Sequence, residues 1–114
     1  METTEPQTLQ LKVAQTLQDF WEFYTGVRPG RATVVIDRQA IAALLEEVLA
    51  PGELQIARTE TGRLTLQKLE ERILEQAEGH LQQMVAEVVG QEVTLVKFHL
   101  DVVTGSIQGF FLRR

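Results

Sequence analysis

A long run of helical periodicity constrains the fold of this 114-residue chain more than any other sequence feature. Between Leu64 and Val89 apolar residues recur every three or four positions, no proline interrupts the run, and Gly90 follows it. This spacing predicts one amphipathic helix, because glycine is favoured at the left-handed position just after a helix. The apolar stripe that should face the core consists of Leu66, Leu69, Ile73, Ala77, His80, Leu81, Met84 and Val88. The charged face that should be solvated consists of Lys68, Glu70, Glu71, Arg72, Glu75, Glu78 and Glu87.

Helical spacing also marks the N-terminal region. Its apolar stripe consists of Leu9, Val13, Leu17, Phe20, Trp21 and Tyr24. Gly26 can end this helix, and Pro29 prevents its continuation. Residues 1–8 are polar and contain a proline, so we expect a flexible tail there and a single domain over residues 9–114.

The C-terminal region alternates between apolar and polar residues, which is typical of β-strands. Within residues 94–102 one predicted face holds Val96, Phe98, Leu100 and Val102, and the other holds Lys97, His99 and Asp101. Residues 104–106 supply a turn, and residues 107–112 return as the second strand of a hairpin.

The segment before the long helix is ambiguous. Residues 32–36 are short and β-branched, which indicates a strand. Residues 40–49 are helix formers by propensity, and Asp37 could cap that helix, but they could equally form the second arm of a hairpin that turns at residues 37–39. Propensity favours the helix. Pro51 and Gly52 then break the chain, and residues 54–61 form a connector that has room for a short helical turn.

Charge and composition exclude several classes of function. The chain carries 16 acidic and 11 basic residues, whereas proteins that bind duplex nucleic acid usually show a basic surface, so we expect no nucleic-acid partner. Cysteine is absent, which excludes disulfides and thiol catalysis and suits a reducing compartment. The sequence shows neither a secretory signal nor a membrane-spanning stretch, so we expect a soluble, cytoplasmic protein without direct membrane insertion.

His99 and Asp101 are the residues that come nearest to a catalytic or metal-binding pair. They stand two apart on a predicted strand, so their side chains share one face, and His80 could in principle complete a zinc site. Nothing in the sequence fixes His80 nearby, and no recognisable nucleophile motif is present. We therefore expect no metal, no cofactor and no catalytic residue. A metal-dependent or general acid–base enzyme that uses His99 and Asp101 is one alternative.

The loop after the first predicted helix is the best candidate for an anion site. Arg28 and Arg31 lie there beside Gly26 and Gly30, and guanidinium groups bind phosphates and carboxylates well. The loop lacks the Lys-Ser/Thr pair of a phosphate-binding loop and follows a helix rather than preceding one. We predict that a functional contact with an anion or an acidic partner, if the protein makes one, lies at Arg28 and Arg31. The second alternative is a domain that senses a small anion or nucleotide at the same loop.

Three stretches resemble one bacterial family of domains of unknown function. Residues 23–32 are similar to the Tyr-Gly-Lys-Gly-Pro-x-Arg-x stretch of that family, and residues 45–53 are similar to its Leu-Glu-x-x-Leu-Thr-x-x-Glu segment. Residues 98–112 are similar to its His-x-Asp…Thr-Gly…Phe-x-Leu ending. The family is labelled MpsC-like, after component C of a sodium-translocating, membrane-potential-generating system. The motif positions in this chain are Gly26, Pro29, Glu46, His99, Asp101, Thr104 and Gly105.

The chain departs from the family pattern at two positions. Ala50 stands where the family has threonine, and Ser106 stands where an acidic residue is expected after Thr-Gly. The resemblance implies a strand over residues 40–46, which we adopt in place of the helix that propensity favours. It also implies a link to membrane ion or bicarbonate transport.

Together these patterns predict an α+β fold of two layers. Two hairpins form a four-stranded antiparallel sheet, packed with the N-terminal helix and the long central helix. We expect a small, non-catalytic accessory or regulatory protein that binds a protein partner, which the resemblance links to a membrane transport component. We also expect a homodimer, because Phe110 and Phe111 must point to opposite faces of the sheet. The aromatic cluster at residues 20–24 and a second apolar flank of the long helix point the same way; that flank consists of Leu74, Leu81 and Val85.

Overall fold

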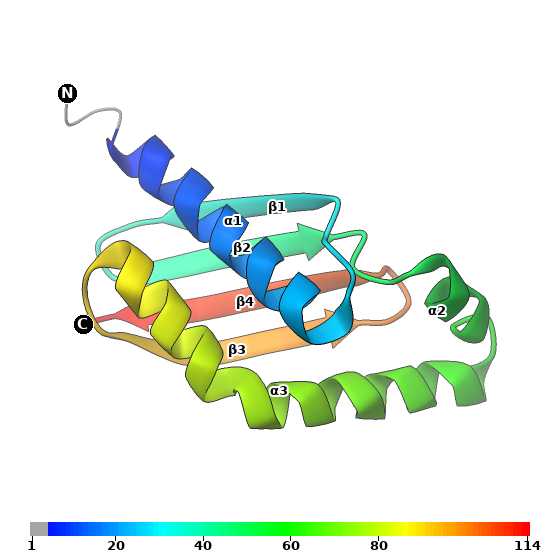
Figure 1. Ribbon diagram of the computed structural model, residues 1–114. Helices are drawn as coiled ribbons and strands as arrows, with labels where there is room; N and C mark the ends of the chain where they lie inside the picture. Colours follow the sequence, from blue (N-terminus) through cyan, green and yellow to red (C-terminus); the bar gives the residue numbers. More distant parts are fainter. Residues whose placement is uncertain (1–4) are drawn as a thin grey trace.

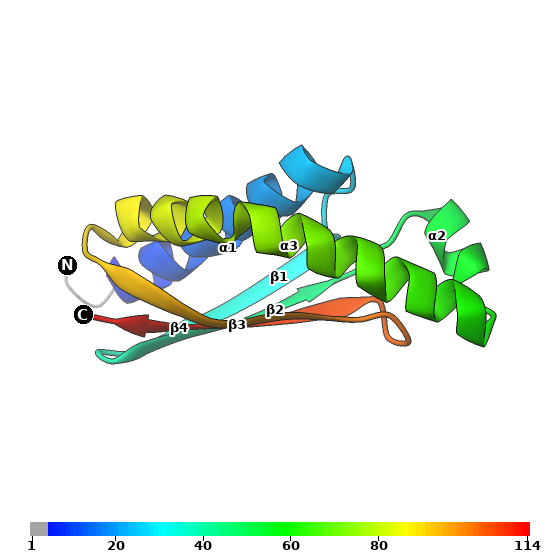
Figure 2. The same ribbon diagram turned by 90° about the horizontal axis from the view of Figure 1, so that it is seen from below.

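The computed structural model describes residues 5–114, and within that range the chain forms three helices and one four-stranded sheet (Figure 1). In chain order the elements are α1 (Glu5–Thr25), β1 (Arg31–Ile36), β2 (Ala40–Glu46), α2 (Pro51–Ile56), α3 (Glu60–Val89), β3 (Val93–Asp101) and β4 (Ser106–Arg113). The sheet is antiparallel, with the strand order β1-β2-β4-β3. Helices α1 and α3 lie on one face of the sheet and leave the other face open (Figure 2). The predicted two-layer α+β architecture is therefore confirmed.

Strand β2 shows that the helix favoured by propensity for residues 40–49 is wrong, and it confirms the strand that the family resemblance implies. Ile41, Ala43 and Leu45 are buried under the helices, and the backbone of β2 pairs with both β1 and β4. A strand with two neighbours satisfies nearly all of its backbone groups, which outweighs the helix preference of its residues. Asp37 closes the preceding turn instead of capping a helix. Its Oδ1 accepts the amide N–H groups two and three residues later, both at 2.8 Å, and these bonds lower its pKa.

Helix α1 begins at Glu5 rather than at Leu9, and residues 1–4 of the predicted tail lie outside the described residues. The predicted apolar stripe is confirmed, and its fully buried members are Val13, Leu17, Phe20 and Trp21. The indole Nε1 of Trp21 donates a 3.0 Å hydrogen bond to the carbonyl oxygen of Val48. This bond fixes the end of α1 against the segment that follows β2.

The buried face of α3 agrees only in part with the stripe that the periodicity predicts, of which Leu66, Ala77 and Leu81 are buried. Its buried residues are Leu66, Glu70, Ala77, Leu81 and Val85. The predicted core residue Leu69 is 51% exposed, His80 is exposed, and Glu70, which was expected in solvent, is 2% exposed. The supposed second flank at Leu81 and Val85 is thus the core face itself. The helix turns this face inward because α1 and β3 both pack along it.

Strand β3 follows the predicted alternation only in its second half. A bulge between Leu95 and Lys97 lets Val96 point outward, so Val96 is 53% exposed instead of buried. Beyond the bulge the prediction holds, and Leu100 is buried. The ring of Phe98 packs edge-on against Phe20 of α1, at a centroid distance of 5.9 Å. The bulge therefore aligns the inward side chains of β3 with the aromatic residues of α1.

The first half of α3 extends past the end of the sheet and carries α2 with it (Figures 1 and 2). The molecule is accordingly elongated, with principal extents of 49 × 24 × 20 Å. The corner between α2 and α3 is tight, because a Cβ at Gly62 would come within 1.8 Å of the carbonyl oxygen of Ile56. Thr59 caps α3 there by accepting the N–H of Gly62. We call α2 and the first half of α3 the arm, residues 51–74.

Candidate functional site

The family-motif positions gather mainly at one end of the sheet, where α1 and β2 end and β3 turns into β4 (Figure 1). The N–H of Gly30 donates to the carbonyl oxygen of Glu46 at 3.0 Å, and the N–H of Val48 donates to the carbonyl oxygen of Gly105 at 3.1 Å. Gly26 and Gly105 have φ angles of 79° and 66°, which favour glycine over other residues. These motif residues therefore hold three segments of the chain together.

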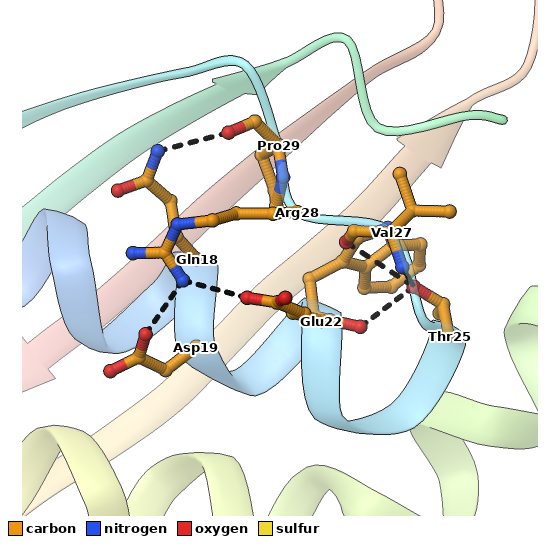
Figure 3. A network of polar contacts seen from close by, with 8 residues as sticks. Gln18, Asp19, Glu22, Thr25, Val27, Arg28 and Pro29 are labelled. Atoms are coloured by element: carbon orange, nitrogen blue, oxygen red, sulfur yellow. Dashed lines mark hydrogen bonds and ion pairs between the residues drawn. The ribbon is translucent and has the colours of Figure 1, made fainter.

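Arg28 is held by two carboxylates of α1 (Figure 3). Its Nη1 donates to Oδ1 of Asp19 at 2.7 Å and to Oε1 of Glu22 at 2.9 Å, and these bonds raise the pKa of the guanidinium. Nε2 of Gln18 donates to the carbonyl oxygen of Pro29 at 3.0 Å and fixes the loop further. An anion at Arg28 would have to compete with both carboxylates.

Arg31 engages a different acidic residue on a different element. Its Nη1 lies 3.7 Å from Oε1 of Glu46, and its side chain is 73% exposed. Alternation along β1, where Val34 is buried, places Arg31 on the open face of the sheet. The structure thus gives Arg28 and Arg31 separate carboxylate partners, and a shared anion site at these two residues stays a prediction.

His99 and Asp101 line a groove of about 470 Å³ between the first half of α3 and the end of β3. Arg63, Leu64 and Gln67 of α3 line the same groove, a neighbourhood that the sequence could not indicate. Oδ1 of Asp101 accepts the N–H groups of the next turn at 3.0 and 3.3 Å. Asp101 therefore helps to build the β3–β4 turn, as aspartate often does.

The two histidines do not come together. Nδ1 of His80 lies 2.7 Å from the hydroxyl oxygen of Tyr24, at the contact between α3 and α1. The ring of Phe23, which is 75% exposed, lies edge-on to His80. Among residues 5–114 no three histidine, aspartate or glutamate side chains are grouped as a metal site. The expectation that His99 and Asp101 bind no metal stays a prediction.

Glu70 is the functional candidate that the sequence reasoning missed. Its Oε2 is buried and has no hydrogen-bond partner. Burial, followed by the nearby charge of Glu53 on α2, raises the pKa of Glu70 from 4.5 to about 7. Unpaired buried carboxyls are rare because burying the charged form without a partner is costly. No sequence signal separates Glu70 from the exposed glutamates beside it.

The arm and the adjacent β3–β4 turn display several exposed apolar side chains. They are Leu54, Ile56, Leu64, Leu69 and Val103, and their exposed fractions range from 49% to 79%. Leu64 and Val103 both line the groove that contains His99 and Asp101. The groove therefore combines apolar contact surface with charged groups.

The chain matches a family model over nearly its whole described length. The family model described as "Na+-translocating membrane potential-generating system (MpsC)" matches residues 5–111. Neither the curated proteins nor the solved structures contain a match to this chain. Of the helices within residues 5–114, none has the length and apolar character needed to cross a membrane.

Proposed function

The chain belongs to the MpsC family, described as a Na⁺-translocating membrane potential-generating system, and from this membership we propose that it is a non-catalytic accessory or regulatory protein of such a system. In this proposal it works in the cytoplasm and binds a membrane transport component. In this proposal the transport component, and not this chain, is inserted in the bilayer.

The groove beside the arm carries the proposal. Leu64 is 56% exposed and Val103 is 79% exposed, on opposite sides of this groove. Arg63 and Asp101 add one charge of each sign to the lining. Apolar side chains surrounded by polar groups are typical of protein-binding surfaces. A segment of the transport component would place an apolar side chain between Leu64 and Val103.

Co-purification from native membranes tests this proposal. Tagged protein added to detergent extracts of its host's membranes should retain a Na⁺-transport protein, identified by mass spectrometry. Leu64→Asp and Val103→Asp should each lower the amount retained at least ten-fold, since an aspartate would bury an unpaired charge in the contact.

Leu11→Asp is the matched control, because Leu11 is 59% exposed on α1 and does not line the groove. Circular dichroism should show that all three variants fold. Retention of the transport protein by the two groove variants at the level of Leu11→Asp would contradict the proposal.

The non-catalytic part of the proposal has its own support and test. Asp101 already accepts two backbone N–H groups, and Arg28 is already paired with two carboxylates. Nucleotides, phosphate and divalent metals should therefore leave the thermal midpoint unchanged. A ligand-dependent rise that disappears in Arg28→Ala/Arg31→Ala would favour the sensing alternative, and one that disappears in His99→Ala would favour the enzyme alternative.

A further inference from the structure

The open face of the sheet has an apolar centre. Alternation along the strands places Val35 of β1, Leu44 of β2, and Phe110 and Leu112 of β4 on this face, opposite the helices. Their exposed fractions are 61%, 37%, 37% and 45%. The strands β1, β2 and β4 follow one another in the sheet, and Val35 shares a register row with Phe110 through Ala42. A contiguous apolar patch of this kind usually marks an interaction surface.

The centre of the face has large residues on one strand and small residues on the next. Phe110 pairs in register with Ala42, and Leu112 pairs with Ala40. Phe110 and Leu112 of β4 therefore form a ridge, and Ala40 and Ala42 of β2 form a depression beside it that ends at Leu44. A second sheet with the same ridge and depression, turned by 180°, would fit this surface.

Opposite charges stand at the two edges of the same face. Arg31 of β1 pairs in register with Glu46 of β2, which pairs with Ser106 of β4. Ser106 pairs in turn with Asp101 of β3. Arg31 and Asp101 therefore lie in one row across the sheet, about 14 Å apart at about 4.8 Å per strand. Within one chain they are too far apart to form an ion pair.

We propose that this face binds a second copy of the chain about a twofold axis that runs between β2 and β4, parallel to the strands. This axis lays β4 over the β2 strand of the second copy and β3 over its β1 strand. Phe110 then packs over the partner's Ala42, and Asp101 faces the partner's Arg31. Each contact occurs twice, as twofold symmetry requires. Sheets that pack face to face keep their strands within about 30° of each other, which preserves these pairings near the axis.

Exposed polar residues surround the apolar centre of this face, and they are Thr33, Lys97, His99 and Gln108. An apolar centre with a polar rim is the usual composition of a protein interface. His99 and Asp101 belong both to this face and to the groove. The dimer needs no membrane component, so its mass is measured on the purified protein alone, whereas the groove is tested by retention of a transport protein.

Solution mass is the first test. Size exclusion coupled to light scattering should give twice the 12.9 kDa of one chain, and Ala42→Trp should give 12.9 kDa because the new ring occupies the place of the partner's Phe110. The matched control Leu11→Trp, on exposed α1 surface, should remain dimeric. Circular dichroism checks that both variants fold. A wild-type mass of 12.9 kDa at all concentrations, or a dimeric Ala42→Trp protein, would overturn the proposal.

Cross-linking tests the direction of the axis. Thr33 on β1 and His99 on β3 share one register row through Leu44 and Gln108, and the chain has no cysteine of its own. In the proposed dimer Thr33 lies opposite the partner's His99. A bismaleimide of about 8 Å reach should join two chains of the double variant Thr33→Cys/His99→Cys, since packed sheets are about 10 Å apart and these side chains point toward each other.

Each single cysteine variant should stay largely uncross-linked, because β1 lies far from the partner's β1 in this arrangement. Equal cross-linking of the single variants would indicate an axis perpendicular to the strands and would refute the proposed one.

A change of charge tests the Arg31–Asp101 contact. Arg31→Glu should weaken the dimer at least ten-fold, and adding Asp101→Asn should restore part of the loss. Asparagine keeps an oxygen for the two turn N–H groups that Asp101 accepts. If the Arg31→Glu protein dimerises as well as the wild type, the proposed contact between Arg31 and the partner's Asp101 is wrong.

Discussion

Replacing Glu70 by glutamine should stabilise the protein increasingly as the pH rises from 5 to 8. Glu70 is 2% exposed as a residue, and its buried Oε2 has no hydrogen-bond partner. Burial and the charge of Glu53 raise its pKa from 4.5 to about 7, so the folded protein holds this proton at a pH where the unfolded chain has lost it. Glutamine has nearly the same shape and carries no charge at any of these pH values.

The direction of the effect follows from proton binding. Below pH 4.5 Glu70 is protonated in both the folded and the unfolded chain, so it adds no pH dependence. Between pH 4.5 and 7 the unfolded chain releases the proton first, so the free energy of unfolding falls as the pH rises. Above pH 7 the folded protein also ionises and the loss levels off. A pKa difference of about 2.5, at 1.36 kcal/mol each, gives a total loss of about 3 kcal/mol.

Urea unfolding of both proteins at pH 5, 6, 7 and 8, at one protein concentration, measures this effect. The difference between Glu70→Gln and wild type should grow by about 1.4 kcal/mol per pH unit and then level off near pH 7. Glu71→Gln is the matched control, since Glu71 is the exposed neighbour on α3, and its difference should stay flat. A Glu70→Gln difference that stays within about 0.5 kcal/mol from pH 5 to 8 would refute the reasoning.

Three further expectations follow from individual contacts. Gly62→Ala should lower the free energy of unfolding by at least about 2 kcal/mol, because its Cβ would come within 1.8 Å of a carbonyl oxygen of α2. Gly79→Ala is the control: its Cβ meets no atom within 4 Å, so it should raise the free energy of unfolding by about 1 kcal/mol. Chemical denaturation measures both. Trp21→Phe should lower the free energy of unfolding by about 2 kcal/mol, since it leaves the buried carbonyl after β2 without its donor; an unchanged urea midpoint would argue against that bond. Elemental analysis of protein purified without added metal should find no stoichiometric zinc, and zinc that is lost in His99→Ala would contradict this.

Periodicity was sufficient for the stripe of α1, which packs against both β1 and α3, and for the alternation at Leu100. In both elements the apolar positions form a single line, so no second line of apolar residues competes for burial. Strand β2 could not be predicted from propensity, because its structure depends on β4, which lies far along the chain. Alanine and leucine favour a helix in isolation, and pairing on both edges outweighs that preference.

The buried face of α3 shows a second limit of pattern reading. Apolar residues occupy two neighbouring lines on this helix, one through Leu69 and Ile73 and one through Leu66 and Leu74. The predicted core stripe includes residues of both lines, yet packing of α3 against α1 and β3 buries Leu66 together with Glu70 and leaves Leu69 exposed. The position of Glu70 therefore depends on contacts between elements. The groove could not be predicted for the same reason: Arg63 and His99 are far apart in the sequence and line one groove only because α3 packs beside β3.

The position of β4 has a consequence for how the chain folds as it leaves the ribosome. Strand β4 is synthesised after β1, β2 and β3, yet it lies inside the sheet, between β2 and β3, rather than at an edge. Until it emerges, the nascent chain carries a β1–β2 hairpin whose inner edge is unpaired and a β3 strand with no neighbour. Such unpaired edges can join those of other nascent chains, and late long-range pairing is slow. A premature stop after β3 would therefore remove β4, the strand that connects β2 to β3. The released fragment should aggregate rather than fold as a slightly smaller domain.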